Sequence, residues 1–598
     1  MGQQQLKEKQ VVIIGAGPAG LSAAYELAKL NQYPVVLEKG DKVGGLARTE
    51  SYKNFHFDMG GHRFFTKAKE VKKLWSEILG QDFLRRPRLS RIYYKRKFFY
   101  YPLRPMNALT GLGLWESIRV VGSYFRWQLV PYRHEETFEQ WVTNRFGKRL
   151  FDIFFKSYTE KIWGIPCSEL KAEWAAQRIK DLSLKTVLMS MFVKPKATIK
   201  SLIEEFDYPR RGPGMMWSGV KAQIEKNGGV VRTNAGVVAI QKNGKGIHSV
   251  VVSSDGCREV IEGSHFISSM PVTEFVKKLE PPAPPTVLEA VEKLKYRDFL
   301  TVGLIVNKPE LFPDNWIYVH DPNVRVGRIQ NFKNWSPEMV PDPMKTSLGL
   351  EYFCTEGDDL WEMPDAELIE LGKRELGRIG VASPSEIEDG CVFRVPKAYP
   401  IYDSGYRDYL AIVKEYLATL ENCQTIGRNG LHRYNNQDHS MLTGMLAVRN
   451  ITLGEHNDLW GVNAEQEFHE EIREKINLEP AFEAVKDALA QAFPKLDRIA
   501  LGISTGTVGG ILLFLATIIL VLKGGAVVGP NLQLLEQYLP GYSVTLSGSL
   551  LGLGYGFVTG FTGGWSFAFL RNVTVFLSLA VMQHRAERVL LKKLLEYI

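Results

Sequence analysis

The stretch "VVIIGAGPAGLSAAYELAKLNQYPVVLEKG" at residues 11–40 decides the fold of the N-terminal part of this chain. Four apolar residues predict a buried strand, a glycine turn follows, and the turn leads into a helix and a second strand. Gly15, Gly17 and Gly20 have the spacing G-x-G-x-x-G, in which the second glycine lets a pyrophosphate approach the backbone. Glu38 ends the second strand, where a carboxylate accepts hydrogen bonds from ribose hydroxyls. Together these features predict a Rossmann-type dinucleotide site.

The composition is that of a folded protein with several domains. The chain has 598 residues, of which 45% are hydrophobic and 23% charged, and its net charge is +8. No Lys/Arg run is long enough to bind nucleic acid, so we expect no nucleic-acid partner. Five scattered cysteines without CxxC spacing favour a reducing compartment over a disulfide framework or a zinc site. His432, Asp438 and His439 lie close together without a further ligand pattern, so no metal site is predicted.

The C-terminal part of the chain has a different character. Residues 499–522 carry no charged side chain, and at ~1.5 Å per residue they are long enough to cross a hydrocarbon core of ~30 Å. A second uncharged stretch, residues 537–570, contains glycines at every fourth position: Gly548, Gly552, Gly556, Gly560 and Gly564. This spacing predicts a packing seam for a helix–helix partner, and a glycine-rich loop is the alternative.

Basic residues predict how these two segments are oriented. Lys495 and Arg498 precede the first segment. The second is followed by a leucine-rich, basic stretch with Arg585, Arg588, Lys592 and Lys593, which is typical of an interfacial helix. The N-terminus is polar and lacks a signal-peptide stretch. We therefore expect a membrane protein with two transmembrane helices, membrane lipid as a partner, and a cytoplasmic catalytic domain.

The segment "DKVGGLARTES" at residues 41–51 extends the dinucleotide motif. A second Gly-Gly pair with an arginine, directly after the ribose acid, resembles the signature of the FAD-dependent amine oxidase, phytoene desaturase and protoporphyrinogen oxidase superfamily. The resemblance implies FAD as the cofactor. It also implies that "GGVVRTNAGVVAI" at residues 228–240 contains the strand whose Val237 backbone pairs with adenine.

Six further stretches resemble UDP-galactopyranose mutases within that superfamily. In chain order they are "FHFDMGGHRFFTK" (55–67), "KRKFFYYPL" (95–103), "SYTEKIWGIPCSEL" (157–170), "VGRIQNF" (326–332), "PKAYPIYDSGY" (396–406) and "TIGRNGLHRYNNQDHS" (425–440). The mutases have similar motifs in the same order, and the matches extend over most of residues 10–450.

This resemblance implies a set of site residues. His62 would lie against the reactive edge of the flavin, with Arg63 and Phe64 shaping that edge, and His62 and Arg328 are the candidate catalytic residues. The implied cofactor-binding residues are Gly15, Gly17, Ala19, Gly20, Glu38, Lys39, Gly45, Leu46, Ala47, Arg48, Gly60, Gly61, His62, Val237, Gly427 and Arg428. Tyr158 would stack on a uracil-like ring, Trp163 would line a sugar pocket, and Arg328, Tyr399 and Tyr434 would hold a diphosphate.

The chain also departs from the mutase pattern. The mutases carry a second diphosphate arginine, which aligns with Leu182; Arg178, Lys180 and Lys185 are nearby candidates to replace it. A late aspartate of the mutase motif is Asn436 here.

The predicted fold class is α/β: a Rossmann-type FAD-binding domain interleaved with a substrate-binding domain of helices and antiparallel sheet, followed by an α-helical two-span transmembrane hairpin. The expected FAD-binding parts are residues 1–67, 229–275 and 416–490. The expected substrate parts are a mainly helical cap at 68–228 and a β region at 276–415. The two membrane helices are expected within 499–570 and a basic amphipathic tail at 571–598.

Three functions remain open from the sequence. The first is a mutase-like flavoenzyme for a nucleotide-linked or polyprenyl-linked sugar. The second is an FAD-dependent oxidoreductase that removes hydride from an apolar, membrane-dissolved substrate. The third is a flavin-binding scaffold that recruits a glycan or lipid assembly.

Overall fold

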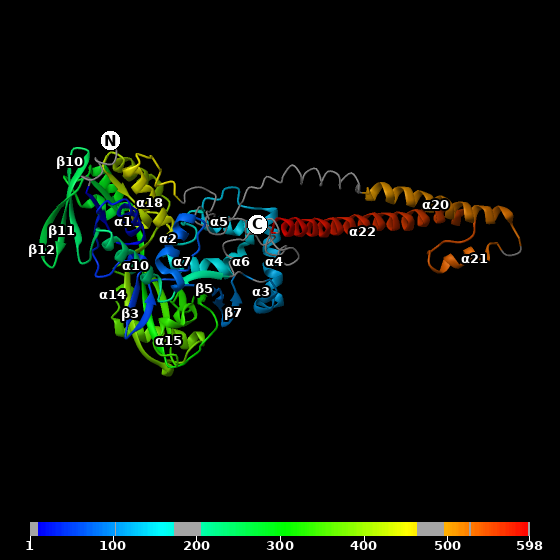
Figure 1. The fold of residues 1–598 in the computed structure, drawn as a ribbon. Helices are drawn as coiled ribbons and strands as arrows, with labels where there is room; N and C mark the ends of the chain where they lie inside the picture. The colour runs from blue at the N-terminus through cyan, green and yellow to red at the C-terminus, as the bar shows by residue number, and fades with distance from the viewer. Residues whose placement is uncertain are drawn as a thin grey trace. The chain divides into compact units, whose positions relative to one another are not determined.

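The computed structural model describes residues 10–101, 103, 105–172, 205–462, 496–525 and 528–595. The chain forms two compact units, Met1–Arg473 and Glu474–Ile598. Figure 1 shows the course of the chain and the labels of its elements. Leu182 and its neighbours Arg178, Lys180 and Lys185 lie outside the described residues.

The first unit begins with the predicted strand–turn–helix–strand motif, which belongs to a five-stranded parallel sheet. The strands, in spatial order, are β20 (Cys423–Thr425), β13 (His265–Ser268), β1 (Val11–Ile14), β2 (Val35–Leu37) and β9 (Val230–Arg232). Helices α1 (Pro18–Lys29), α2 (Lys69–Leu79), α10 (Pro213–Lys226) and α18 (Gln437–Thr452) contribute to the apolar core on one face. Val11 and Ile13 of β1 point into this core, whereas Val12 and Ile14 point into the core on the other face. The continuous apolar run therefore reflects a strand that is buried on both faces.

The second face of this sheet is covered by a smaller sheet and by further helices. The smaller sheet has the order β12 (Cys257–Glu262), β11 (Gly246–Ser254), β10 (Gly236–Asn243) and β14 (Leu279–Glu280). Helices α11 (Val272–Lys277), α12 (Pro285–Lys293) and α16 (Tyr406–Leu417) pack on the same side. Two short antiparallel pairs, β3 (Thr49–Tyr52) with β4 (Phe55–Asp58) and β5 (Phe83–Pro87) with β8 (Glu205–Pro209), join this part to the rest.

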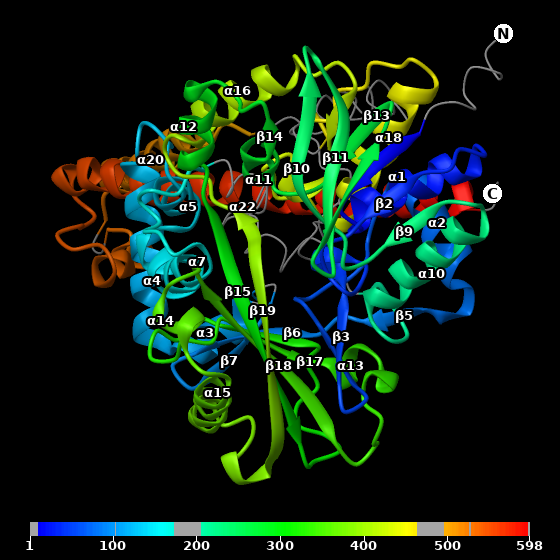
Figure 2. The ribbon, with the colours of Figure 1, turned by 90° about the vertical axis from the view of Figure 1, so that its left-hand side faces the viewer.

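A seven-stranded sheet forms the other half of the first unit. Its order is β19 (Ile387–Pro400), β15 (Tyr296–Val306), β18 (Thr346–Cys354), β17 (Arg328–Asn331), β16 (Trp316–Val319), β6 (Ser90–Tyr94) and β7 (Lys97–Tyr100). Figure 2 shows β15 and β19 side by side, with α15 (Asp365–Ile379) against the sheet. Leu300, Val302 and Leu304 of β15 pack toward α15, while Phe299 points to the opposite face. Period-2 alternation thus gives the sheet one face for its own core and one for the site.

Helices cover the site face at the β6–β7 end. They are α3 (Pro105–Leu112), α4 (Leu114–Leu129), α5 (Phe138–Phe146), α6 (Lys148–Phe151) and α7 (Ser157–Trp163). Thr137 caps α5 by accepting from Gln140 N, and the Gln140 side chain accepts from Thr137 N, a capping box that fixes the start of α5. Short helices α13 (Phe332–Trp335), α14 (Asp359–Glu362) and α17 (Gly427–Gly430) complete the described part of this unit.

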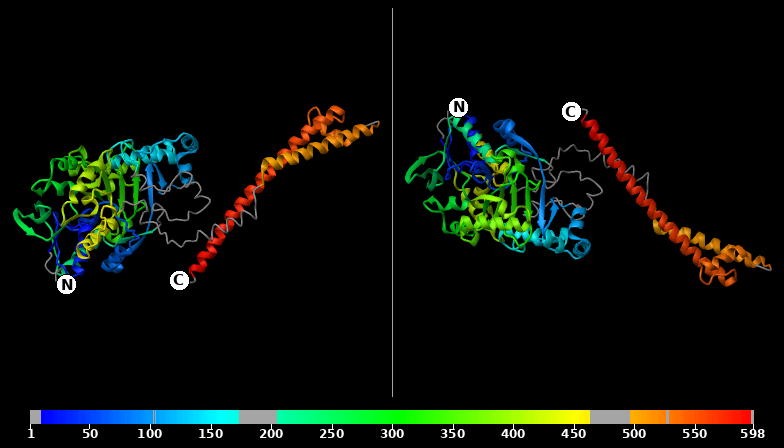
Figure 3. Two further views of the ribbon diagram at one scale, coloured as in Figure 1. Left: turned by 90° about the horizontal axis from the view of Figure 1, so that it is seen from above. Right: turned by 90° about the horizontal axis from the view of Figure 1, so that it is seen from below.

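The second unit is a helical hairpin. Helices α20 (Arg498–Lys523) and α22 (Leu546–Leu595) lie side by side, with the short α21 (Pro530–Gln533) in the connection (Figures 1 and 3). The close approach uses the predicted glycines: a Cβ at Gly556 would lie 2.5 Å from Gly509 O, and one at Gly560 would lie 2.4 Å from Thr505 O. Thr505 Oγ1 also donates to Gly560 O at 2.7 Å. The seam at Gly556, Gly560 and Gly564 therefore packs on α20 of the same chain, and a partner from another chain remains a prediction.

Two details of the hairpin differ from the sequence-based expectation. The second uncharged stretch starts at residue 537, but α22 begins only at Leu546, because Pro540 and Gly541 with φ +76° interrupt the chain. Gly548 consequently faces Ser543 O of this turn rather than α20. Helix α22 also runs without a break through residue 570 to Leu595, and the expected division into span and tail at that residue remains a prediction.

Among the described residues, α20 is the helix that is long and apolar enough to cross a membrane by length and composition. Its exposed side carries large apolar residues, including Ile503, Leu512 and Ile519, together with Ser504 and Thr507. Its buried positions include Gly502, Gly506 and Gly510, which face α22. A second span in α22 remains a prediction.

Candidate active site

A cavity of about 870 Å³ joins the two halves of the first unit. One end is lined by the first glycine turn, Glu38 and the β10 strand, and the other by the face of the seven-stranded sheet. Its size is within the range of sites for cofactors and small molecules. Most of the predicted cofactor and substrate residues line it: Gly15, Gly17, Ala19, Glu38, Lys39, Gly45, Leu46, Ala47, Gly60, Gly61, His62, Val237, Arg328, Tyr399, Gly427, Arg428 and Tyr434.

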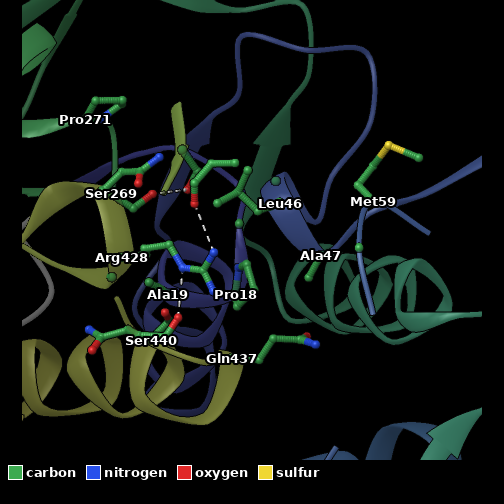
Figure 4. Close-up of a pocket in the computed structure, with 18 of the residues that line it drawn as sticks. Pro18, Ala19, Leu46, Ala47, Met59, Ser269, Pro271, Arg428, Gln437 and Ser440 are labelled. Carbon is green, nitrogen blue, oxygen red and sulfur yellow. Dashed lines mark hydrogen bonds between the residues drawn. The ribbon is translucent and has the colours of Figure 1, made fainter. Parts of the chain in front are cut away.

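The glycines of the two turns form the floor of the dinucleotide end. Gly17 faces the Cα of Gly45, and a Cβ built on Gly45 would lie 3.1 Å from Gly17 Cα. Gly427 approaches from α17, where an added Cβ would be 2.9 Å from that of Ala19. Figure 4 shows Pro18, Ala19, Leu46 and Ala47 around this part of the cavity, with Arg428 and Ser440 beside them. A side chain at Gly45 or Gly427 would press on the facing turn, so glycine at these positions lets the turns that line the cavity approach each other.

Glu38 is held in position by two backbone amides. Its Oε2 accepts from Ala16 N at 2.8 Å and its Oε1 accepts from Gly40 N at 2.9 Å. The carboxylate nevertheless lines the cavity. It is therefore fixed where it can also accept hydrogen bonds from ribose hydroxyls, and the residues at this end fit an FAD dinucleotide.

His62 lies at the other end of the cofactor region. Its Nε2 contacts Met59 O at 2.8 Å, and since a carbonyl only accepts, Nε2 carries the hydrogen. Burial, followed by the charges of Arg428 and Arg328, lowers the pKa of His62 to about 4. His62 is thus a neutral imidazole at physiological pH. Its catalytic role remains a prediction.

Arg328 is paired with a carboxylate that sequence analysis missed. Arg328 on β17 lies directly opposite Glu351 on β18, and its Nε donates to Glu351 Oε2 at 2.9 Å. Glu351 is fully buried and also accepts from Gln330 Nε2 at 2.9 Å. This pair holds the guanidinium rigidly at the cavity surface. The strand "TSLGLEYFC" carried the only sequence signal, a carboxylate within an otherwise apolar buried strand.

Tyrosines and Arg428 form the wall next to Arg328. The rings of Tyr399 and Tyr434 stack with centroids 5.6 Å apart, and the guanidinium carbon of Arg428 lies 4.6 Å from the Tyr434 centroid. Arg428 Nε donates to Asn435 O at 2.9 Å and its Nη1 donates to Ala398 O at 3.0 Å. Burial raises the pKa of Tyr399 to about 12, so its phenol remains a neutral donor.

A second guanidinium, that of Arg63, lines the substrate end. Its Nη1 is buried and has no hydrogen-bond partner among the described residues. Burial, and then the charge of Arg63, lowers the pKa of Arg88, whose guanidinium carbon lies 5.5 Å from the centroid of Trp316. Trp316 itself lines the cavity. The sequence placed Arg63 at the flavin edge, but only the tertiary structure brings it together with Arg88 and the Trp316 ring.

Several predicted residues lie outside the cavity lining. Arg48 donates to Glu50 Oε1 at 2.7 Å and to Gly45 O at 3.1 Å, and Gly20 packs inside α1. Tyr158 stacks on His320 with centroids 4.7 Å apart, and Trp163 is buried beyond Tyr399 and Tyr434.

The backbone amide of Gly427 already has a hydrogen-bond partner. Its amide donates to Thr443 Oγ1 at 2.9 Å, so it is not available to the flavin in this structure. The cofactor and substrate roles of Arg48, Gly20, Tyr158 and Trp163 remain predictions. Among the described residues, no group of three or more His, Cys, Asp or Glu side chains has the geometry of a metal site.

Comparison with known proteins identifies the family. The model of flavin-containing amine oxidoreductases matches residues 18–432, more than half of the chain. The chain belongs to the flavin-containing amine oxidoreductase family. FAD is therefore the cofactor of this protein, and the cavity residues described above fit it.

The chain is similar to curated proteins with different names. It is 23% identical over 401 residues to 15-cis-phytoene desaturase of Capsicum annuum, and 21% identical over 326 residues to an L-amino-acid oxidase of Sistrurus catenatus edwardsii. These matches cover 62% and 50% of this chain. They span 65% of the desaturase and 58% of the oxidase, less than two thirds of either relative.

Solved structures share the fold. A reduced UDP-galactopyranose mutase superposes with a TM-score of 0.66 at 22% identity, covering 77% of this chain and 98% of the mutase. A putative protoporphyrinogen oxidase from Exiguobacterium sp. 255-15 superposes with a TM-score of 0.58 at 18% identity, covering 75% of this chain and all of that one. At these identities the likeness establishes the fold alone.

Asp58 is a buried carboxyl next to the cofactor region, and its titration makes the stability of the folded protein depend on pH. It ends β4 just before the Gly60–Gly61 loop and accepts from Tyr208 Oη at 2.5 Å and from Thr49 Oγ1 at 2.8 Å. Burial raises its pKa from 3.8 to about 7, against the opposing effect of the two hydroxyls. Because the folded pKa is raised, its stabilisation is fully present below pH 3.8 and is lost as the pH rises through about 7.

Asp58→Asn removes this titration. We expect the Tm of the FAD-loaded wild type to fall between pH 5 and pH 8 by on the order of 5 °C more than that of the variant. Thermal unfolding followed by circular dichroism at several pH values measures this. The exposed Asp41→Asn serves as control and should keep the wild-type profile. Parallel profiles for wild type and Asp58→Asn would contradict the assignment.

Proposed function

We propose that this protein is a membrane-anchored flavoenzyme that acts on a nucleotide-linked or polyprenyl-linked sugar and binds the diphosphate of that substrate. The observation that carries the proposal is the pair of guanidinium groups, Arg63 and Arg328, at the substrate end of one cavity with Tyr399 and Tyr434. Guanidinium forks and phenols are the donors that a diphosphate prefers.

The charges around the cavity support an anionic substrate. The acidic residues of the lining are Glu38, Asp255, Glu274 and Asp438, and Glu274 is paired with Lys397. Glu351 is not part of the lining and is paired with Arg328. Arg63 Nη1 is a buried donor without a hydrogen-bond partner among the described residues. Such a donor gains a hydrogen bond when an anion enters, which adds about 1.5–3 kcal/mol for a charged pair.

The chain's own residues then position the substrate. Arg328, held by Glu351, and Arg63 bind the diphosphate, while neutral Tyr399 donates to it. His62, neutral and fixed by Met59 O, forms an uncharged wall beside the cofactor. Bound FAD supplies the reactive centre at the sugar carbon that carries the diphosphate. Stabilisation of the leaving diphosphate is the main contribution of these residues.

Membrane anchoring rests on α20. The helix is long and apolar enough to cross a bilayer, and most of its large exposed side chains are apolar. A hairpin with α22 as the second span places both ends of the hairpin on one side of the membrane, and the flanking basic residues favour the cytoplasmic side.

A second function is favoured by the family match and by the aromatic part of the lining. Phe299, Trp316 and Trp335 give the substrate end apolar surface. An oxidoreductase that removes hydride from an apolar substrate would use that surface, and Arg63 and Arg328 would have no anion to bind.

The test is ligand binding to the FAD-loaded full chain with reduced flavin. We expect UDP and UDP-sugars to bind, as measured by calorimetry. Arg63→Gln should weaken this binding ~10–100-fold, because one charged hydrogen-bond set is lost. Arg63→Lys should restore part of it, since the charge but not the bidentate geometry is kept.

Arg85→Gln is the matched control, because Arg85 is exposed on β5 and pairs with Asp207 outside the cavity. It should bind UDP-sugars like the wild type. Absence of UDP-sugar binding, together with anaerobic flavin reduction by a polyprenoid or carotenoid, would replace the sugar proposal by the oxidoreductase.

A further inference from the structure

Helix α4 has an apolar face that the described residues of the first unit leave exposed. Leu114 is 80% exposed, Phe125 61% and Leu129 82%. The exposed large apolar residues of this helix and its end are Leu114, Trp115, Ile118, Val121, Phe125, Leu129 and Val130. Contiguous apolar surface of this kind marks an interaction site in soluble proteins.

The spacing of the apolar residues places them on one side of the helix. Residues 114, 118, 121, 125 and 129 are separated by three or four positions, so at 3.6 residues per turn they share one side. The opposite side is fixed to the neighbouring helices: Ser117 and Val120 are buried, and Arg149 Nη2 donates to Glu116 Oε2 at 2.9 Å. The outward direction of the apolar face is therefore set by packing.

Basic residues lie along one flank of this face. Arg119 and Arg126, two turns apart, are exposed next to Trp115, and the Arg119 guanidinium carbon lies 5.5 Å from the Trp115 centroid. The turn of the β6–β7 hairpin adds Lys95, Arg96 and Lys97, and Lys97 Nζ donates to Gly111 O at 2.7 Å just before α4. An apolar stripe with Trp and Phe beside a cationic flank is the pattern of a helix that lies in a membrane interface.

We propose that α4 lies in the plane of an anionic bilayer, with its apolar face in the acyl boundary and Arg119, Arg126 and the hairpin turn toward the headgroups. The proposal rests on the membrane anchoring proposed for α20, because a chain with that helix keeps its first unit within reach of a bilayer. The cationic flank favours lipid over a second copy, since two such faces would bring like charges together. The contact of α4 with lipid would thus be a second membrane contact, in addition to the α20 anchor, and it would be made by the first unit.

The experiment uses the full FAD-loaded chain in vesicles of phosphatidylcholine and phosphatidylglycerol at three to one. In a Cys257→Ser background, which removes the exposed native thiol, Ile118→Cys and Phe125→Cys are labelled with an environment-sensitive fluorophore. We expect blue-shifted emission that spin-labelled lipids quench. Met344→Cys, 62% exposed on a loop of the seven-stranded sheet, is the control and should show neither effect.

The outcomes separate the two proposals. If the protein floats with the vesicles but the probes at 118 and 125 behave like the probe at 344, the docking of α4 is overturned and the membrane anchor stands. Failure of the full chain to float would overturn both. Pyrene excimers between copies labelled at position 118 would assign the face to a dimer and overturn lipid docking. Phe125→Glu with Leu129→Glu should abolish lipid quenching of the probe at 118 and leave flotation unchanged.

Discussion

Arg328→Ala will abolish detectable binding of diphosphate ligands and will destabilise the protein by ~3–5 kcal/mol. The substitution removes a guanidinium from the cavity and leaves Glu351, which is fully buried, without its cation. Calorimetry with UDP measures the first effect, and chemical unfolding of the FAD-loaded protein measures the second.

The double variant Arg328→Ala with Glu351→Gln separates these effects. Neutralising the buried carboxylate should restore most of the stability, because the amide oxygen introduced at this position can still accept from Gln330 Nε2. It should not restore ligand binding. Recovery of UDP binding in the double variant would show that Arg328 acts only through stability.

Gly20→Ala will prevent FAD retention. A Cβ at Gly20 would lie 2.0 Å from Gly15 O, a backbone atom of the dinucleotide turn, and 3.2 Å from Ile13 Cγ2. Since α1 and β1 are both buried, the turn must move, and the cavity floor moves with it. The measurement is the ratio of flavin absorbance near ~450 nm to protein after purification.

The control is Gly122→Ala on the exposed side of α4, where an added Cβ meets no atom within 4 Å. This variant should bind FAD like the wild type and gain up to ~1 kcal/mol of helix stability. A Gly20→Ala protein that purifies with a full complement of FAD would contradict the packing role of this glycine.

The sequence was most informative where the signal is local. The G-x-G-x-x-G turn, the apolar strand before it and Glu38 lie within 28 residues of chain, and each carries its own backbone or charge requirement. The same holds for the Gly60–Gly61 loop, because the motif around it points to the cofactor region, which His62 alone would not do. The hairpin at residues 90–100 was also predictable, since its strands are adjacent in sequence.

The remaining features depend on residues that are distant in the chain. Arg328 meets Glu351 because β17 and β18 pair in one register. A shift of one strand by one residue would place the two side chains on opposite faces of the sheet. Arg48 was predicted to meet the cofactor, yet Glu50 engages it locally. Sequence patterns do not rank such competing partners, because the ranking depends on burial and on distances of a few ångströms.

The dinucleotide fold, its FAD signature and a long apolar C-terminal helix follow from the residues alone, because backbone geometry and hydrophobic length are local properties. Three features needed the folded chain: Arg63 joins Arg328 at the substrate end, the glycines of α22 pack on α20, and α4 presents its apolar face outward. An amphipathic pattern shows that a helix has an apolar side. Only the packing of the opposite side determines whether that face is turned to the core or away from it.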